Sequence, residues 1–369
     1  MKSKPSPGLA LWFSIAPALL LPAVTLAGQS APSIAAGGLA PSSDPRIIVA
    51  RELVRISDRK VAVEYDLRND TASDITTELG FVVPPYTNQW NLMDPAVQAF
   101  RSFHVWADGE PIEYRTETKA DLDGLDVTKT LEKAKIDIPT FGHMNLGKDQ
   151  HQASRTVFVG DYERLTPKEK HRLRGEGLFK GEEGFSMYTV DMRYHWAQQL
   201  PAHSTVHLRM EYTPVVGFTL APPQASDLQA ALTPVAATPG AAPGTARKEA
   251  SHLLGGFCPD TQFIRTMMNA NKYYAQNWGS GIVPHWVDFD LRADAGWRKP
   301  IDDFTLVIDI PEPEHGQRTV VSFCSPGVVE KKDSDHPQVH LTKYVPGTDL
   351  HIGFFNAPYE PPGTPIAAK

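Results

Sequence analysis

The sequence predicts a mainly β (α+β) fold of two antiparallel β-sandwich-like units, with a helical insertion and one helix leading the C-terminal unit. Three observations lead to this prediction. Apolar and polar residues alternate in many segments of strand length, which is typical of strands with one face in a core. Short turn sequences join consecutive segments, which favours antiparallel pairing. An Ala/Pro-rich stretch divides the pattern into two parts.

The first 27 residues have the composition of a secretory signal peptide. Two lysines precede an apolar core from Leu9 to Leu21, and residues 25–27 offer a small-residue site for cleavage near Ala27. The core is shorter than the roughly 20 residues that a membrane-spanning helix needs, and Pro17 interrupts it. We therefore expect a periplasmic or secreted protein whose mature chain has no membrane span.

The first unit is predicted to cover residues 28–220. Val61, Val63 and Tyr65 alternate with charged residues, so one face of this strand should lie in a core. Asp108-Gly109 has the residues of a tight hairpin turn, and Pro84-Pro85 should end an earlier strand. The predicted strands are 47–56, 60–68, 75–83, 103–107, 111–115, 185–196 and 206–212.

The helical insertion is predicted near residues 120–180, where charged residues become more frequent. Thr166-Pro167-Lys168-Glu169 combines a hydroxyl N-cap, a proline at the first helical position and the glutamate of a capping box. A helix should therefore begin there and run to about Leu173. A second helix is predicted at Val127–Ala134.

Residues 221–249 are mainly Ala, Pro, Thr and Gly, and they contain no aromatic residue. Such a stretch buries too little apolar surface to offset the entropy of ordering, so we predict a flexible linker. A short helix around Ser226–Leu232 is the alternative. Residues 358–369 are Pro-rich and are predicted to form a flexible tail.

The second unit is predicted to cover residues 250–357. Phe263, Met267 and Tyr274 fall on one side of a helix that begins this unit, and such a stripe is more typical of a core than of a cofactor site. The predicted strands are 286–291, 304–310, 319–323, 339–344 and 350–355.

The chain has two cysteines, Cys258 and Cys324. In an exported protein, two cysteines are the number needed for one disulfide. This bridge would close about 67 residues and would stabilise the fold by roughly 4 kcal/mol in the chain-entropy account. No C-x-x-C motif supports a redox role.

Three groups of residues follow one another along the chain in a recognisable order. The first is Ala36-Gly37-Gly38-Leu39 with Leu67-Arg68-Asn69 and Phe81-Val82-Val83-Pro84. The second is Trp196, Leu200-Pro201-Ala202, Tyr212-Thr213-Pro214 and Gly217. The third is Cys258-x-Asp260, Trp297-x-x-Pro300-Ile301-x-x-Phe304-x-Leu306-Val307-x-Asp309 and Val321-Ser322-Phe323-Cys324. In this order they resemble the exported bacterial family known as domain of unknown function 4424. The resemblance covers roughly residues 36–357. It implies export and a single-chain body, and it supplies no catalytic residues. The long linker before Cys258 departs from the family pattern.

Charge and motifs exclude several classes of function. The chain carries 36 Lys and Arg against 43 Asp and Glu, without a long basic block, so we expect no nucleic-acid partner. No nucleophile elbow, P-loop or dinucleotide fingerprint occurs, and we expect no cofactor. His203 and His207 lie four residues apart, about 13 Å on a strand, which is too far for one metal ion. We therefore predict no metal site.

Two groups of side chains are candidates for function. His285, Asp288 and Asp290 form the densest group of histidine and carboxylates, and we consider them as catalytic residues. Solvent-facing alternation on a strand is the simpler interpretation, and we favour it. Trp278, Trp286 and Trp297 lie within 20 residues and are candidates for an aromatic binding surface, although burial in a core is the commoner fate of such residues.

We therefore expect a non-enzymatic binding or assembly module of the cell envelope, whose partner is an envelope protein or a glycan. The alternative is an envelope hydrolase with a His/carboxylate site between the two halves of the chain.

Overall fold

The computed structural model describes residues 30–31, 33–40, 44–87, 102–139, 142–146, 156–182, 184–219, 228, 254, 256–278, 281–291, 297, 299–331, 336–347 and 349–359. The predicted signal peptide, nearly all of the predicted linker and the predicted tail beyond residue 359 lie outside these residues. Within them, no helix is both long and apolar enough to cross a membrane.

The largest sheet has eight strands and contains segments from both sides of the linker. Its strands, in spatial order, are β20 (Glu330–Lys331), β21 (Pro337–Tyr344), β18 (Ile301–Ile308), β3 (Ile47–Ile56), β4 (Val61–Asn69), β15 (Ser204–Tyr212), β6 (His104–Ala107) and β7 (Glu110–Pro111). The pairing of β18 with β3 is parallel, and the other pairs are antiparallel. How the chain divides into independently folding units at 28–220 and 250–357 stays a prediction, but this sheet crosses the predicted boundary.

Two five-stranded sheets accompany the large sheet. One has the order β2 (Leu39–Ala40), β5 (Ile75–Thr87), β14 (Thr189–Leu200), β8 (Arg115–Leu122) and β9 (Leu125–Asp126). The other has the order β1 (Ser30–Ala31), β16 (Gly217–Thr219), β17 (His285–Phe289), β22 (Leu350–Pro358) and β19 (Gln317–Phe323). Two hairpins pair β10 (Gly142–Leu146) with β11 (Thr156–Gly160) and β12 (Phe179–Lys180) with β13 (Phe185–Ser186).

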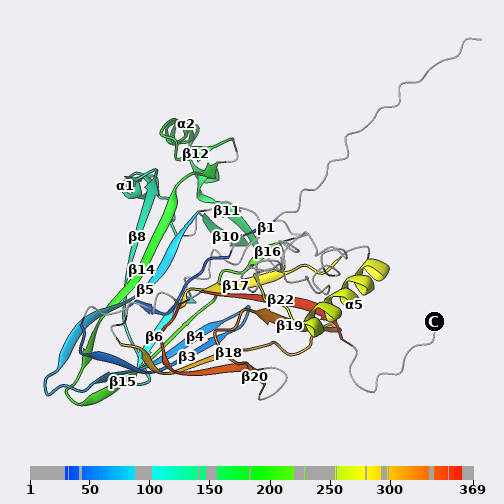
Figure 1. Cartoon of the computed structure of the whole chain (residues 1–369). Coiled ribbons are helices and arrows are strands. Elements are labelled where there is room, and N and C mark those ends of the chain that lie inside the picture. The colour runs from blue at the N-terminus through cyan, green and yellow to red at the C-terminus, as the bar shows by residue number, and fades with distance from the viewer. Residues whose placement is uncertain are drawn as a thin grey trace, which may run out of the picture.

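The main core lies between the eight-stranded sheet and the two five-stranded sheets. One cluster of buried side chains joins Tyr65 of β4, Phe81 of β5, Phe304 of β18 and Phe354 of β22. Figure 1 shows β17 and β22 over β3, β4 and β18, with β5, β14 and β8 rising on one side. The predicted mainly β, sandwich-like fold is confirmed.

The period-two pattern of the sequence corresponds to real strand faces. Along β14, residues alternate between buried and exposed, and the buried side includes Met192, Tyr194 and Trp196. The predicted hairpin is also present, because β6 and β7 flank Asp108 and Gly109, whose φ angles are 50° and 87°. Positive φ at both central residues is what a type I′ turn requires.

One predicted strand end is wrong, because β5 continues through Pro84-Pro85 to Thr87. The register between β5 and β14 shifts between Val190 and Met192, opposite these prolines. An irregularity of this kind leaves one strand locally unpaired, so it accommodates residues that have no N–H to donate.

In the part of the insertion that the structure describes, three short helices or helical turns lie at the end of β8 and β14 (Figure 1). They are α1 (Thr128–Lys133), the 3₁₀ turn η2 (Asp161–Arg164) and α2 (Pro167–Gly175). At the start of α2, Thr166 and Glu169 form the predicted capping box. Leu131, Leu173 and Tyr188 share a separate buried cluster in this part of the molecule.

The long helix α5 (Thr261–Trp278) packs on the second five-stranded sheet. Its apolar side includes the predicted residues Phe263, Met267 and Tyr274, which share a buried cluster with Phe355 of β22. Val320 of β19 packs against the same cluster. The helix therefore covers the face of β22 and β19, the last two strands of that sheet.

Candidate functional site

A disulfide joins the start of α5 to the end of β19. Cys258 and Cys324, the pair predicted from the sequence, form this bridge, and their Cα atoms are 4.9 Å apart. Asp260 follows two residues later, and its Oδ1 accepts a hydrogen bond of 2.7 Å from the N–H of Phe263. This carboxylate caps the helix and favours a defined entry of the chain into α5.

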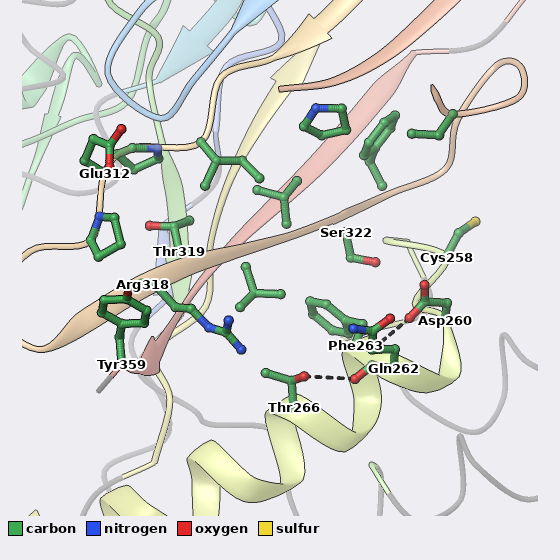
Figure 2. A pocket seen from close by; sticks show the side chains of 18 residues that line it. Cys258, Asp260, Gln262, Phe263, Thr266, Glu312, Arg318, Thr319, Ser322 and Tyr359 are labelled. Carbon is green, nitrogen blue, oxygen red and sulfur yellow. Dashed lines mark hydrogen bonds between the residues drawn. The ribbon is translucent and has the colours of Figure 1, made fainter. Parts of the chain in front are cut away.

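A cavity of about 750 Å³ lies beside this disulfide, between the first turns of α5, the strand β19 and the loop at residues 310–313. Figure 2 shows α5 along one side of the cavity and β19 along the other. The lining residues are Cys258, Asp260, Gln262, Phe263, Thr266, Ile310, Pro311, Glu312, Pro313, Arg318, Thr319, Val320, Val321, Ser322, Phe323, Val329, Pro337 and Tyr359.

The cavity runs along the edge of β19 and not over one of its faces. All six residues from 318 to 323 contribute to the lining. Successive side chains of a strand point to opposite faces, so a space that is lined by six residues in a row is expected beside the strand, where both faces are within reach. β22 pairs with β19 on its other side, and β19 is the last strand of its sheet.

Polar side chains of the cavity are held mainly by hydrogen bonds to nearby groups. Ser322 Oγ donates to the carbonyl of Phe257 at 2.8 Å, and Thr266 Oγ1 donates to the carbonyl of Gln262 at 3.0 Å. Arg318 is exposed and forms no ion pair within the part of the chain that the structure describes. The cavity thus offers an available cation together with apolar surface.

The three residues proposed as a catalytic group do not come together. His285 and Asp288 both lie on β17, but their spacing of three residues places them on opposite faces of the strand. His285 Nε2 lies 3.2 Å from Asp58 Oδ2 and its ring stacks on Phe354. Asp290 comes just after the strand. None of the three lines the cavity.

A different pair forms around Asp288, which contacts His351 Nδ1 with one oxygen and accepts a hydrogen bond from Ser33 with the other. Asp288 and His351 are direct cross-strand partners on β17 and β22. The His351 ring stacks on Phe257, with centroids 4.2 Å apart. His351 and Ser33 were missed because no local pattern in the sequence indicates which residue faces Asp288 across the sheet.

Two of the three tryptophans predicted as an aromatic surface, Trp286 and Trp297, are not among the residues that line the cavity. Trp286 is partly exposed and packs on Gly217, where a Cβ atom would come within 2.3 Å of the indole. Trp297 is 8% exposed and belongs to the main core. The side chain of Trp278 lies outside the described residues. A binding role for these residues stays a prediction.

Several histidines among the described residues contact one carboxylate, and His207 lies near two, Asp66 and Glu64. Within the described part of the chain, no three metal-ligand side chains approach closely enough to hold an ion. His207, for example, contacts Asp66 at 2.8 Å, and His340 contacts Asp303 at 3.2 Å.

Comparisons with known proteins identify a family but no function. No curated protein matches the chain significantly. A crystal structure from Legionella pneumophila, described provisionally as a nutrient binding protein, is similar at 12% identity and a TM-score of 0.40, covering 88% of this chain and 72% of that one. So low a score supports no functional argument. The family model "Domain of unknown function (DUF4424)" matches residues 27–352, and the chain therefore belongs to that family.

Proposed function

We propose that this protein is a non-enzymatic binding module of the cell envelope, and that it binds its ligand in the cavity between α5 and β19. The cavity itself carries this proposal. Its volume of about 750 Å³ falls within the range of ligand sites, and its lining combines apolar side chains with a few polar groups, as such sites do.

The cavity is also supported by rigid elements. The disulfide ties the start of α5 to the end of β19, and the buried cluster of Phe263, Phe355 and Val320 fixes the helix on the sheet. Walls held in this way lose little conformational freedom when a ligand binds, which favours affinity.

An extracytoplasmic location is part of the proposal. A disulfide persists in oxidising compartments, and the first 27 residues have a signal-peptide composition. Mass spectrometry of the protein isolated from its native envelope fraction should find an N-terminus near residue 28. A mature protein that keeps residues 1–27 would contradict export by cleavage.

The binding proposal is tested with a variant that obstructs the cavity. Thr266 lines the cavity, so Thr266→Trp should place an indole ring in the space between α5 and β19. Ala275 is exposed on the same helix, nine residues away, which is the opposite side of α5, so Ala275→Trp is the matched control. Circular dichroism should show that both variants are folded.

Immobilised mature protein is exposed to native envelope extract, and the retained molecules are identified by mass spectrometry. The unchanged chain and Ala275→Trp should retain the same molecule, and Thr266→Trp should retain at least about tenfold less of it. Retention that is absent, or equal in all three proteins, would refute binding in this cavity.

The hydrolase alternative now rests on two His/carboxylate pairs, of which only the pair of His285 and Asp58 connects the two parts of the chain. His285 contacts Asp58, and His351 contacts Asp288. A histidine held by a carboxylate can act as a general base. Turnover of ester and amide substrates from the envelope, lost on His285→Ala or His351→Ala, would favour the enzyme. Absence of turnover over the panel would set it aside.

A further inference from the structure

The backbone of β19 indicates which of its groups face the cavity. Gln317 exchanges two hydrogen bonds of 2.9 Å with Glu314, on the edge away from β22. Its partner across the sheet on β22 is Pro358, which has no N–H to offer. In a strand, the N–H and C=O of one residue point to the same edge, and the edge alternates from residue to residue.

This alternation assigns every residue of β19. Arg318, Val320 and Ser322 direct their backbone groups to β22, whereas Thr319, Val321 and Phe323 direct theirs to the cavity. Over the described residues, no hydrogen bond is assigned to the three N–H and three C=O groups on the cavity side. These backbone groups are therefore positioned to form hydrogen bonds with an additional strand beside β19.

The walls of the cavity differ on the two faces of β19. Figure 2 shows Arg318 and Ser322 on the α5 side of the strand, and Thr319 and Glu312 on the other side. Gln262 and Thr266 of α5 make the first wall polar. On the other side, residues 310–313 contribute one isoleucine and two prolines, and Val321 and Phe323 share that face of the strand.

We propose that β19 is the docking edge for an extended peptide segment of a partner protein, which adds to the sheet as a strand beyond β19. This rests on the proposed function and specifies its ligand. Strand addition uses backbone hydrogen bonds for affinity and alternate side chains for selection. The segment should carry apolar side chains toward the proline side and an acidic side chain opposite Arg318.

Charge favours a partner segment over a second copy of this chain. β19 reads Gln-Arg-Thr-Val-Val-Ser-Phe and contains no acidic residue. Two copies that paired through β19 could therefore not supply an acid from that strand to Arg318. Asp260 is engaged as the helix cap, and Glu312 lies on the other side of the strand, so the acid must come from the ligand.

The first experiment selects phage-displayed random peptides of about 12 residues on the immobilised mature protein. Enriched sequences should alternate apolar with polar residues and share an acidic position. A selected peptide is then synthesised with N-methyl groups on alternate residues. Methylation of the residues whose N–H groups face β19 should weaken binding by at least about tenfold, and methylation of the other set by less than about twofold.

The second experiment reverses the charge. Arg318→Glu should weaken the selected peptide by about tenfold or more, and a peptide with Lys at its acidic position should restore binding. Arg265 is exposed on α5 outside the cavity lining, so Arg265→Glu is the control and should leave binding unchanged. An equal effect of both reversals would refute the role of Arg318.

The outcomes separate this inference from the proposed function. One outcome is that Thr266→Trp blocks the peptides, but that the two N-methylated forms of a peptide bind equally well. This outcome would refute strand addition and leave binding in the cavity intact. Peptides that bind regardless of Thr266→Trp would refute the cavity as their site. A dimer of the mature protein that Thr266→Trp dissociates would overturn the proposal in favour of a second copy.

Discussion

At the scale of single residues, Asn69 joins two of the family-like segments in space, Leu67-Arg68-Asn69 and Leu200-Pro201-Ala202. It is fully buried at the end of β4, and its Nδ2 lies 2.9–3.1 Å from the carbonyl oxygens of Ser73, Leu200 and Pro201. Its Oδ1 accepts hydrogen bonds from Thr71. One amide therefore connects the turn after β4 to the corner between β14 and β15.

Replacement of Asn69 should be costly, because its fully buried amide bonds the carbonyl of Leu200 in the interior and its Oδ1 accepts the N–H and hydroxyl of Thr71, and all of these bonds would be lost. We expect Asn69→Ala to lower the free energy of unfolding by about 2–4 kcal/mol, measured by urea denaturation. Asn277 lies near the exposed end of α5, and its Nδ2 bonds only to Tyr273 among the described residues. Asn277→Ala should therefore cost less than about 0.5 kcal/mol, and equal losses would contradict this account.

Asp302 should contribute to stability in a pH-dependent manner. The hydrogen bond from Lys343 is the main cause that lowers the pKa of Asp302, and Arg68 adds to it. Because the folded state favours the ionised carboxylate, this stability is present above the unfolded-state pKa of about 3.9. It is lost as the pH falls through the lower folded-state pKa.

Asp302→Asn should therefore lower the free energy of unfolding at neutral pH, by less than about 1 kcal/mol because solvent screens the pair. The difference should disappear in acid. Urea denaturation across the acidic range checks this, and Asp302→Asn should have a smaller effect in a Lys343→Met background. A loss that is the same at every pH would show that the ion pair is not its cause.

The sequence could nominate candidate residues of the site but not their partners. His285 and Asp288 were identifiable because their side chains carry chemistry. Their contacts with Asp58 and His351 depend on strand register and on packing between distant segments. Arg318 was missed for the same reason, because a single arginine has no signal until the cavity beside it is known.

At the scale of elements, features that depend on residues close in sequence, such as helix starts, were predicted correctly. The capping box at Thr166 was readable because a helix cap involves residues only three positions apart. The continuation of β5 through Pro84-Pro85 could not be predicted from the sequence, because the irregularity that accommodates the prolines belongs to the pairing with β14. The edge position of β19 also depends on strand order, which no pattern within the strand records.

The disulfide should stabilise the junction of α5 and β19. A thiol assay on unreduced, denatured protein should find no free thiol. The double variant Cys258→Ser/Cys324→Ser should lose roughly 4 kcal/mol of unfolding free energy, because the bridge closes a long loop in the unfolded chain. The unchanged protein measured in reductant is the matched control and should behave like the variant. Two titratable thiols per chain would contradict the bridge.

At the scale of the whole molecule, β18 joins the part of the chain after the linker to the part before it. This strand follows the linker, yet it pairs in parallel with β3, and Thr305, Leu306 and Val307 lie opposite Leu53, Val54 and Arg55. The main core likewise combines residues from both sides of the linker. Parallel pairing between such distant segments has no signature in composition or periodicity, so the sequence alone could not show that the eight-stranded sheet and the sheet with β22 combine strands from both sides of the linker.

This sharing predicts that the parts before and after the linker fold together. A fragment of residues 28–220 would expose the edge of β3 and the side of the core that Phe304 and Phe354 cover. We expect it to be unfolded or aggregated alone, because unpaired edges and uncovered apolar surface favour association. Coexpression with residues 250–369 should restore a soluble complex that unfolds in one cooperative transition, as the intact chain should. Calorimetry of the intact chain and of the fragments measures this. An independent transition of fragment 28–220 would instead mean that the first unit folds by itself and that β18 only docks onto a finished sheet.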